Sequence, residues 1–472
     1  MTWKRCLALA GAMLQPAILT PAAAQEWQQY ARPEEAGFSS ERLERTRQIA
    51  DSLLSGGAFV VYRGKVLVAW GDVSRKLQLH SVRKSLTSAL VGMAVTERKI
   101  ELDATLGALQ IEDTNQLTSA EKSATIRDVI SARSGIYLPA AYAPSEQDST
   151  RPERGAHAPG TRWFYNNWDF NVAETIYQRQ TGNSIYEAFA AKIAAPLGME
   201  DFQAADGFVA YEPSLSAFPA HTWRMSARDL ARFGQLFLQR GIWNGKEIVP
   251  ANWVAQSTAA VSDLGNGRGY GYMWWTYAPN SYGSRYTALN MYASFAAHGS
   301  GGQAIIVVPD AQLVIVHRGD TDHNRGWATG RVWALVDNIL AARSGEAKAD
   351  AAVVALAPLP FATQLPPLVK PQLLPTSETE VAALVGEYDI GQPLHVRITR
   401  YEGRPFLFMH EGRPFLFMPG RGEAELLRTD AWRYTIAVVP GVVIAAQRDS
   451  SQQVAGLTVQ MGGRTISARR VP

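Results

Sequence analysis

HSVRKSLTSALVG, at residues 80–92, places a serine at the start of an apolar, helix-forming segment. Ser81 and Lys84 are three residues apart, so on a helix both side chains project from one face. A serine hydroxyl is a weak nucleophile until a base removes its proton, and a desolvated lysine near other cations can lose its own proton and become that base. The start of a helix adds partial positive charge and unpaired backbone N–H groups, which suit an oxyanion. The pair predicts a nucleophilic serine with a lysine base, although such pairs also occur by chance in many helices.

A second segment, PGTRWFYNNW at residues 159–168, contains a tyrosine and an asparagine with one residue between them. A Pro-Gly turn leads into this aromatic run. By themselves, Tyr165 and Asn167 would be ordinary loop residues that pack on a core. Their position downstream of Ser81 and Lys84 makes that interpretation much less favourable, so both are candidates for the same site.

A third segment, AHGSGGQ at residues 297–303, runs into an apolar stretch. Residues 304–309 predict a buried strand, residues 310–311 its turn, and residues 312–317 the partner strand. The glycine-rich segment therefore lies at the start of a predicted hairpin.

In order and spacing, these three segments resemble the S-x-x-K serine hydrolases, a β-lactamase-related group that includes class C β-lactamases, carboxylesterases and aminohexanoate-dimer hydrolases. The resemblance covers roughly residues 30–345. Further matching stretches are PLGMED at 196–201, MSARDLARFG at 225–234 and GYGYMWW at 269–275. The resemblance implies that the Tyr165 oxygen exchanges protons with the nucleophile and the leaving group, and that Asn167 orients Lys84 and the substrate carbonyl. Because the chain has no Gly-x-Ser-x-Gly elbow, an α/β-hydrolase is disfavoured.

Family members carry Lys-Thr-Gly, or His in place of Lys, at the start of the third segment's strand, and the residue after the glycine donates the second oxyanion N–H. With Gly299 as the motif glycine, Ala297 takes the lysine position and His298 the threonine position. Ser300 is then the oxyanion donor. With His298 as the lysine substitute, every position shifts by one. We prefer the first register, in which residues 299–303 resemble the aminohexanoate-dimer hydrolases and carboxylesterases. The lysine is absent in either register.

The predicted elements indicate a mixed α/β (α+β) fold. Residues 58–62 and 66–70 predict an early hairpin, residues 304–317 a late one, and a closing helix is expected near residues 327–343. The chain between the hairpins is mainly helical. This order predicts one antiparallel sheet flanked by helices, beside a helical lobe, with Ser81 in the cleft. The family resemblance implies the β-lactamase/transpeptidase-like form of this architecture.

Residues 1–24 are predicted to be a signal peptide, with two basic residues, an apolar stretch and a cleavage site at residues 22–24. The apolar stretch is too short, and too interrupted by Pro16, to span a membrane. The mature protein is therefore expected in the periplasm or outside the cell. The single cysteine, Cys6, lies in the signal peptide, so the mature chain has no disulfide and no thiolate metal site.

Two domains are predicted in the mature chain. Residues 25–345 form the hydrolase domain, and residues 346–378, rich in Ala and Pro, predict a semi-rigid linker. Residues 379–472 contain short strand-like segments and resemble the small, barrel-like lipocalin-type β domain appended to many family members. Within them, EGRPFLFM at 402–409 recurs at 411–418, which a tandem duplication explains.

The chain carries 46 Lys and Arg against 43 Asp and Glu, and a net charge of +3 is too small to indicate a nucleic-acid partner. His317, Asp320, Asp322 and His323 share one short loop, but their spacing matches no metal-ligand signature. We therefore expect no metal and no cofactor. The sequence contains no feature that sets an oligomeric state.

We expect a serine hydrolase that cleaves a small-molecule ester, amide or peptide substrate through an acyl-enzyme on Ser81. A β-lactamase or a D-aminopeptidase/DD-peptidase is the alternative among enzymes, and a catalytically idle penicillin-recognising or wall-binding protein is the alternative from another class. Without the motif lysine, neutral esters should be preferred to penicillins, unless Arg83 or Arg162 supplies a cation. The candidate catalytic residues are Ser81, Lys84, Tyr165 and His298, and the candidate substrate-binding residues are Asn167, Gly299 and Ser300.

Overall fold

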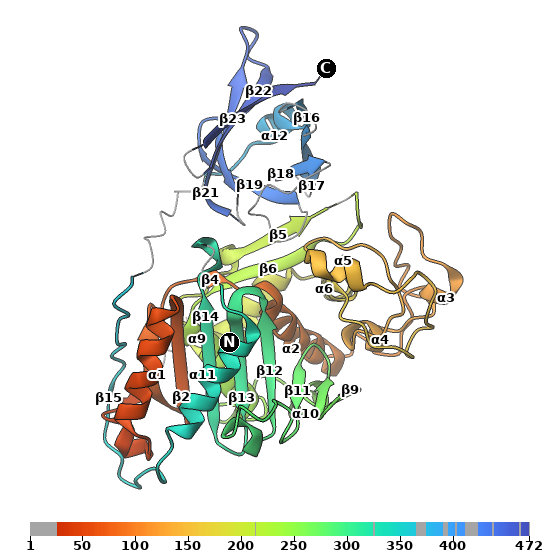
Figure 1. Ribbon diagram of the computed structural model, residues 1–472. Helices are drawn as coiled ribbons and strands as arrows, with labels where there is room; N and C mark the ends of the chain where they lie inside the picture. The colour runs from red at the N-terminus through yellow and green to blue at the C-terminus, as the bar shows by residue number, and fades with distance from the viewer. Residues whose placement is uncertain are drawn as a thin grey trace, which may run out of the picture.

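The computed structural model describes residues 26–212, 214–323, 326–364, 374–389, 395–401, 404–410, 423–436, 439–461 and 464–471. The chain first builds a helix-covered sheet and then a small all-β domain (Figure 1). This is the predicted mixed α/β architecture with a separate C-terminal β domain. The predicted signal peptide and the second copy of the repeated octapeptide lie outside the described residues. Within the described part, no helix has the length and apolar character needed to cross a membrane.

A ten-stranded sheet forms the centre of the larger body. Its spatial order is β15-β1-β3-β2-β14-β13-β12-β11-β10-β9, antiparallel except for the pair β1 and β3. The strands are β1 Gln28–Tyr30, β2 Ser55–Tyr62, β3 Lys65–Gly71, β9 Ser262–Gly265, β10 Arg268–Tyr270, β11 Trp275–Tyr277, β12 Ser294–Gly299, β13 Gln303–Val308, β14 Leu313–Gly319 and β15 Val353–Ala355. The early hairpin (β2, β3) and the late one (β13, β14) are both present, and β14 pairs with β2. One sheet thus unites the two ends of the hydrolase sequence, as predicted.

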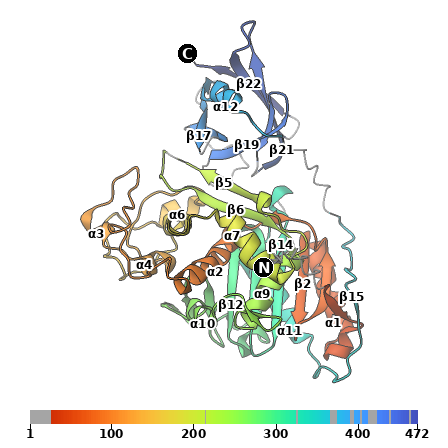
Figure 2. The ribbon, with the colours of Figure 1, turned by 180° about the vertical axis from the view of Figure 1, so that it is seen from behind.

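Side chains of the central strands alternate between two cores, one on each face of the sheet. Val314 and Val316 lie in the core under α2 and α9, whereas Leu313 and Ile315 lie in the core under α1 and α11. Helices α1 and α11 cover the face seen in Figure 1, and α2 and α9 cover the face seen in Figure 2. These helices are α1 Ser40–Ser52, α2 Arg83–Thr96, α9 Ala227–Leu238 and α11 Thr329–Ala341. Because both faces are covered, the central strands are continuous apolar runs.

The insert between the hairpins is mainly helical, as predicted. Besides α2 and α9, its helices are α3 Ser119–Lys122, α4 Ile126–Ile130, α5 Ser145–Thr150, α6 Asn167–Thr181, α7 Ile185–Phe189, α8 Ala195–Leu197 and α10 Ala251–Ser257. It also contains a ribbon, β4-β6-β5, made of β4 Leu77–Gln78, β5 Gly207–Tyr211 and β6 Ala220–Met225. A two-residue strand such as β4 is too short to leave an alternating pattern in the sequence. The ribbon matters for the site because β4 runs directly into the Ser81 turn.

The C-terminal domain is a curled antiparallel sheet preceded by one short helix. Its elements are α12 Glu378–Leu384, β16 Gly386–Asp389, β17 His395–Tyr401, β18 Arg404–His410, β19 Glu423–Asp430, β20 Arg433–Ile436, β21 Val439–Arg448, β22 Val454–Met461 and β23 Arg464–Arg470. The spatial order is β18-β17-β16-β23-β22-β21-β20-β19, and β18 also pairs with β19, so the ends of the sheet meet as a barrel requires. β19 also pairs with β5, which attaches this domain to the β4-β6-β5 ribbon.

Part of the predicted linker packs on the hydrolase body. β15 pairs with β1, and the Leu359 N–H donates to the Ala69 carbonyl at 2.9 Å. The Phe361 side chain is 6% exposed and fills the space in front of Gly71, where a Cβ atom would lie 2.6 Å from the ring. The Phe361 ring is thus buried against the body, whereas the side chains of Val353, Val354 and Leu359 stay exposed. The predicted domain limits themselves stay predictions.

Candidate active site

The turn that carries the serine joins β4 to α2. A short 3₁₀ helix at His80–Val82 runs directly into α2, which puts Ser81 at the start of a helical segment and Lys84 in the first turn of α2. Ser81 is partly exposed, whereas the Lys84 side chain is buried. An accessible hydroxyl thus lies beside a buried amine, with the helix start that the sequence predicts.

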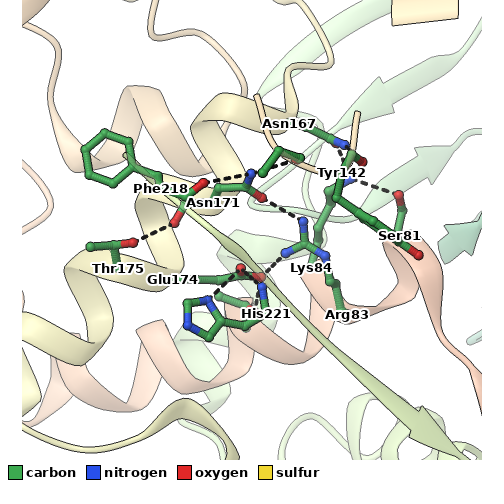
Figure 3. A network of polar contacts seen from close by, with 12 residues as sticks. Ser81, Arg83, Lys84, Tyr142, Asn167, Asn171, Glu174, Thr175, Phe218 and His221 are labelled. Atoms are coloured by element: carbon green, nitrogen blue, oxygen red, sulfur yellow. Dashed lines mark hydrogen bonds and ion pairs between the residues drawn. The ribbon is translucent and has the colours of Figure 1, made fainter. Parts of the chain in front are cut away.

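The Lys84 amine brings three of the predicted site residues together. Its Nζ atom lies 2.8 Å from Ser81 Oγ, 2.7 Å from the Tyr165 hydroxyl oxygen and 2.8 Å from Asn167 Oδ1. Figure 3 shows the amine between Ser81 and Asn167. Two segments that are distant in the sequence, the start of α2 and the start of α6, therefore meet at one nitrogen.

The surroundings of Lys84 favour its neutral form. Burial holds the pKa of Lys84 well below its usual value, and the neighbouring charge of Arg83 lowers it further. The Glu174 carboxylate acts in the opposite direction. A lowered pKa gives access to the uncharged amine, which is the form that accepts a proton.

Arg83 points away from Ser81 into a buried polar network (Figure 3). Its guanidinium is ion-paired with Glu174 and donates to Asn171 Oδ1 at 2.8 Å. Burial alone would raise the pKa of Glu174, but the charge of Arg83, with help from His221, holds that pKa below its usual range. Since the Arg83 and Glu174 side chains are 1% and 0% exposed, Arg83 is not the substrate-binding cation that the sequence left open.

Tyr165 and Asn167 lie at the start of α6. Burial raises the pKa of Tyr165 to about 12, against the opposing effects of its hydrogen bond with Ser81 and the charge of Arg83. The phenol therefore keeps its proton near neutral pH. Asn167 Nδ2 donates to the Tyr142 carbonyl at 2.6 Å, and this bond turns Oδ1 toward Lys84.

Two other serines on α2 have different partners. The Ser85 hydroxyl donates to the Met273 carbonyl and the Ser88 hydroxyl to the Tyr272 carbonyl, each at 2.7 Å and both buried. A hydroxyl that already donates to a buried carbonyl is poorly placed to attack a substrate. Among the serines of this helical segment, the geometry singles out Ser81.

The end of β12 lies against the Ser81 turn. A Cβ atom on Gly299 would lie 2.5 Å from the Leu79 carbonyl oxygen and 3.1 Å from the Ser81 backbone nitrogen, so only glycine fits there. Ser300 follows as the exposed first residue of a short turn. This close approach favours the register in which Gly299 is the motif glycine, although the oxyanion role of Ser300 stays a prediction.

His298 lies beside the Ser81 cluster, in an aromatic environment. Its Nε2 is 3.3 Å from the Tyr277 hydroxyl, and its ring packs at 4.8 Å from the Trp333 ring. Burial lowers the pKa of His298 to about 4, so the ring is neutral at pH 7. Since its hydrogen-bonding partner is Tyr277, the contacts place His298 outside the Ser81, Lys84 and Tyr165 cluster, and its catalytic role stays a prediction.

Comparison with known proteins identifies the family of this chain. The family model described as Beta-lactamase matches residues 41–317, which is more than half of the chain. The chain belongs to the beta-lactamase family. The match begins in α1, ends in β14 and contains every predicted site residue.

Individual relatives are distant. A D-aminopeptidase from Brucella anthropi is 28% identical over 176 residues, which are 31% of this chain and 32% of that protein, so the match spans about a third of the relative's length. A crystal structure of SurE has a TM-score of 0.47 at 17% identity and covers 92% of this chain and 98% of its own. The octameric penicillin-binding protein homologue from Pyrococcus abyssi has a TM-score of 0.48 at 14% identity, covering 91% and 99%.

The histidines and aspartates that the sequence places in one loop are held by protein contacts, and His317 lies in β14 rather than in that loop. His317 bonds to Ser55 and to the Gly302 carbonyl, at 2.9 and 2.7 Å. The Asp322 carboxylate is paired with Arg224. Within the ranges that the structure describes, no group of three or more His, Cys, Asp or Glu side chains is suited to a metal.

Sequence reasoning missed the residues that support the site. Glu174 and Asn171 hold Arg83, and Tyr142 holds the Asn167 amide. None of them belongs to a family motif quoted above. Their roles arise from contacts across 25 to 91 residues of sequence, which leave no local pattern.

Proposed function

We propose that this beta-lactamase family member is a serine hydrolase that cleaves ester or amide bonds through an acyl-enzyme on Ser81. The predicted signal peptide supports a location in the periplasm or outside the cell. The observation that carries the proposal is the 2.8 Å separation of Lys84 Nζ from Ser81 Oγ in a buried setting that lowers the pKa of the lysine. A base within hydrogen-bonding distance is what a serine nucleophile needs.

The three neighbours of Nζ match the valences of a neutral amine. Such an amine has two N–H donors and one lone pair. If Asn167 Oδ1 and the Tyr165 oxygen accept the two N–H bonds, the lone pair of the neutral amine is left facing Ser81 Oγ, 2.8 Å away. As Ser81 Oγ bonds to the carbonyl carbon of the substrate, its proton moves to Nζ. The backbone N–H groups of Ser81 and Ser300 then stabilise the oxyanion.

Tyr165 is suited to complete the reaction because its pKa of about 12 keeps it protonated. It donates its proton to the leaving oxygen or nitrogen as the bond from the carbonyl carbon breaks, and it takes the replacement proton from Lys84. Water then attacks the acyl-enzyme, losing a proton to the same groups, and Ser81 leaves with a proton restored. The cycle consumes one water and returns every catalytic group to its starting state.

Within this proposal, neutral esters are the preferred substrates. Ala297, at the motif lysine position, is buried and apolar, Arg83 is sequestered by Glu174, and His298 is uncharged at pH 7. A fixed cation that pairs with a buried substrate carboxylate is worth on the order of 2–5 kcal/mol, or about 30-fold to several thousand-fold in affinity. Penicillins and wall peptides carry such a carboxylate, whereas short esters do not.

A D-aminopeptidase is the second candidate, supported by the relative from Brucella anthropi that matches 31% of this chain. An idle wall-binding protein is disfavoured, because a binder needs neither the buried amine nor the proton carrier that Lys84 and Tyr165 provide. A panel of nitrophenyl esters, nitrocefin and D-aminoacyl anilides separates the enzymatic candidates.

The test is covalent labelling of the full-length protein with a fluorophosphonate, followed by peptide mapping and a panel of nitrophenyl esters, nitrocefin and D-aminoacyl anilides. We expect the label on Ser81 and the highest kcat/KM on a short ester. Ser81→Ala should lose labelling and turnover, and Lys84→Ala should slow acylation by several orders of magnitude. Ser85→Ala is the matched control and should retain both. Labelling that survives in Ser81→Ala contradicts the proposal.

A further inference from the structure

Two residues beside the site have backbone conformations that L-residues seldom adopt. His80, directly before Ser81, has a φ of 49°, and Tyr142 has a φ of 60°. Their rings stack at 6.1 Å with an interplanar angle of 12°. Such conformations persist only where surrounding contacts hold them, and they concentrate at functional sites. The contacts of this pair therefore merit a functional explanation.

Both ring nitrogens of His80 are hydrogen-bonded in a nearly closed environment. Nδ1 lies 2.8 Å from the Tyr142 hydroxyl and Nε2 2.9 Å from the Thr321 hydroxyl, and the residue is 3% exposed. The Tyr142 hydroxyl also accepts from the side-chain amide of Gln78. Its own proton is then directed to Nδ1, which leaves the Nε2–H to donate to Thr321. One tautomer of the neutral ring satisfies every partner.

Tyr142 connects this ring to the catalytic amine. Its hydroxyl bonds to His80, and its backbone carbonyl accepts from Asn167 Nδ2 at 2.6 Å. An asparagine amide has its oxygen on one side and its donors on the other, so a carbonyl on the Nδ2 side directs Oδ1 to Lys84 Nζ. The chain of contacts runs from His80 through Tyr142 and Asn167 to Lys84 and returns to Ser81, the residue after His80.

We infer that His80 is a positioning residue for the Ser81–Lys84 pair. It holds Tyr142 in its left-handed conformation, and the Tyr142 carbonyl fixes the Asn167 amide that orients Lys84. The inference rests on the proposed function, because it assumes that Lys84 is the base. Loss of the His80 contacts should misplace the base and, among the candidate substrate-binding residues, disturb Asn167 alone, so kcat should fall much more than KM changes.

Three variants isolate these contacts. His80→Gly keeps the left-handed backbone without strain and removes both ring bonds. His80→Asn tolerates the same φ and places an amide where Nδ1 was, so it keeps the bond to Tyr142 and loses the bond to Thr321. Tyr142→Phe removes the hydroxyl but keeps the carbonyl. Tyr137→Phe is the control, since Tyr137 is a buried tyrosine whose hydroxyl has no hydrogen-bond partner among the described residues.

The measurement is kcat and KM on a nitrophenyl ester, with thermal melting of each full-length variant. We expect kcat to fall about 10- to 100-fold in His80→Gly and about 10-fold in Tyr142→Phe, with KM changed less than about 2-fold. His80→Asn should recover kcat to within about 3-fold of the parent, and the double variant His80→Gly/Tyr142→Phe should be no slower than the slower single variant. Tyr137→Phe should match the parent.

Parental kcat in a folded His80→Gly variant overturns the inference, as do additive losses in the double variant. If His80→Gly does not fold, the test is the comparison of kcat between Tyr142→Phe and Tyr137→Phe. Equal kcat values in these two variants overturn the inference. Ser81→Ala separates the two proposals. If it retains activity, the proposed function fails, whereas an inactive Ser81→Ala with unaffected His80 and Tyr142 variants rejects the positioning role alone.

Discussion

Arg83, the residue before Lys84, forms a buried ion pair with Glu174, and the two side chains are 1% and 0% exposed. The pair ties the first turn of α2 to α6 and places a fixed cation next to the proposed base. It also keeps Arg83 from binding substrate. The pKa of Lys84 is therefore set by a local balance in which burial and Arg83 lower it and Glu174 raises it.

Glu174→Gln should disturb that balance in a defined direction. Without the carboxylate, the effect that raises the pKa of Lys84 is lost, so the pKa falls further and the acidic limb of kcat/KM moves to lower pH. Arg83 becomes an unpaired buried charge, which should cost about 3–5 kcal/mol of unfolding free energy. pH–rate profiles and chemical denaturation measure the two effects. An acidic limb that moves to higher pH contradicts the balance. Glu41→Gln, at an exposed position of α1, is the control.

Tyr165→Phe tests the proton carrier. The variant keeps the ring, which stacks on Trp275 at 5.4 Å, and removes the hydroxyl that lies 2.7 Å from Lys84. We expect an unchanged melting temperature and a loss of roughly 100-fold or more in kcat on a nitrophenyl ester. Near-parental turnover at an unchanged melting temperature would mean that the Tyr165 hydroxyl serves packing alone.

Elements with strong local patterns were predictable from the sequence. The hairpins at residues 58–70 and 304–317 show the apolar runs of buried strands, and the helix that begins after Ser226 shows its cap, with the Ser226 hydroxyl accepting from the Asp229 N–H. Ser81 and Lys84 were predictable for the same reason, since a spacing of three residues fixes their relation on any helix.

Relations set by tertiary contact were not predictable. The φ of His80 depends on partners at residues 142 and 321, and the pairing of Arg83 with Glu174 joins two helices 91 residues apart. Composition did not indicate the contacts at residues 353–363: Ala and Pro suggested a semi-rigid linker, and within that segment β15 pairs with β1 and the Phe361 ring is buried.

Acid should destabilise the fold through histidines whose pKa is lowered by desolvation. His298 is an example, with a pKa lowered to about 4 by burial from an ordinary value of 6.5. Between these values the unfolded chain binds more protons at this histidine than the folded chain does. The contribution of the histidine to the unfolding free energy is therefore fully present above pH 6.5 and is lost as the pH falls toward 4. The loss for this histidine at pH 5 is about 2 kcal/mol. His298→Phe should therefore reduce the fall in unfolding free energy between pH 7 and pH 5, measured by denaturant titration. An unchanged fall would show that His298 is protonated in the folded state.

The hydrolase body should fold without the C-terminal domain, provided that the truncated chain still contains Phe361. A chain ending after residue 364 keeps β15 and the buried ring, and should fold and retain most activity on a small ester, because the predicted site residues all precede that position. A chain ending after residue 345 loses both and should be less stable by about 3–5 kcal/mol, the usual cost of deleting a buried phenylalanine. Phe361→Ala in the full chain is the matched control. An inactive but folded chain ending after residue 364 would show that the C-terminal domain contributes to the site.

Substrate class is the final prediction, and it follows from the missing cation. Ala297 is 1% exposed in the apolar core under α2, so the motif lysine position offers no charge, and His298 is neutral at pH 7. We expect clear hydrolysis of short-chain nitrophenyl esters, and turnover of penicillins, cephalosporins and nitrocefin that is weaker by at least about 100-fold in kcat/KM. The ester preference should survive His298→Ala far better than Ser81→Ala, because the His298 ring bonds to Tyr277 rather than to the nucleophile. Parallel assays of the parent and both variants at pH 7 measure these ratios. Nitrocefin turnover equal to ester turnover would reject this substrate class and favour a β-lactamase, in which some other group must then hold the substrate carboxylate.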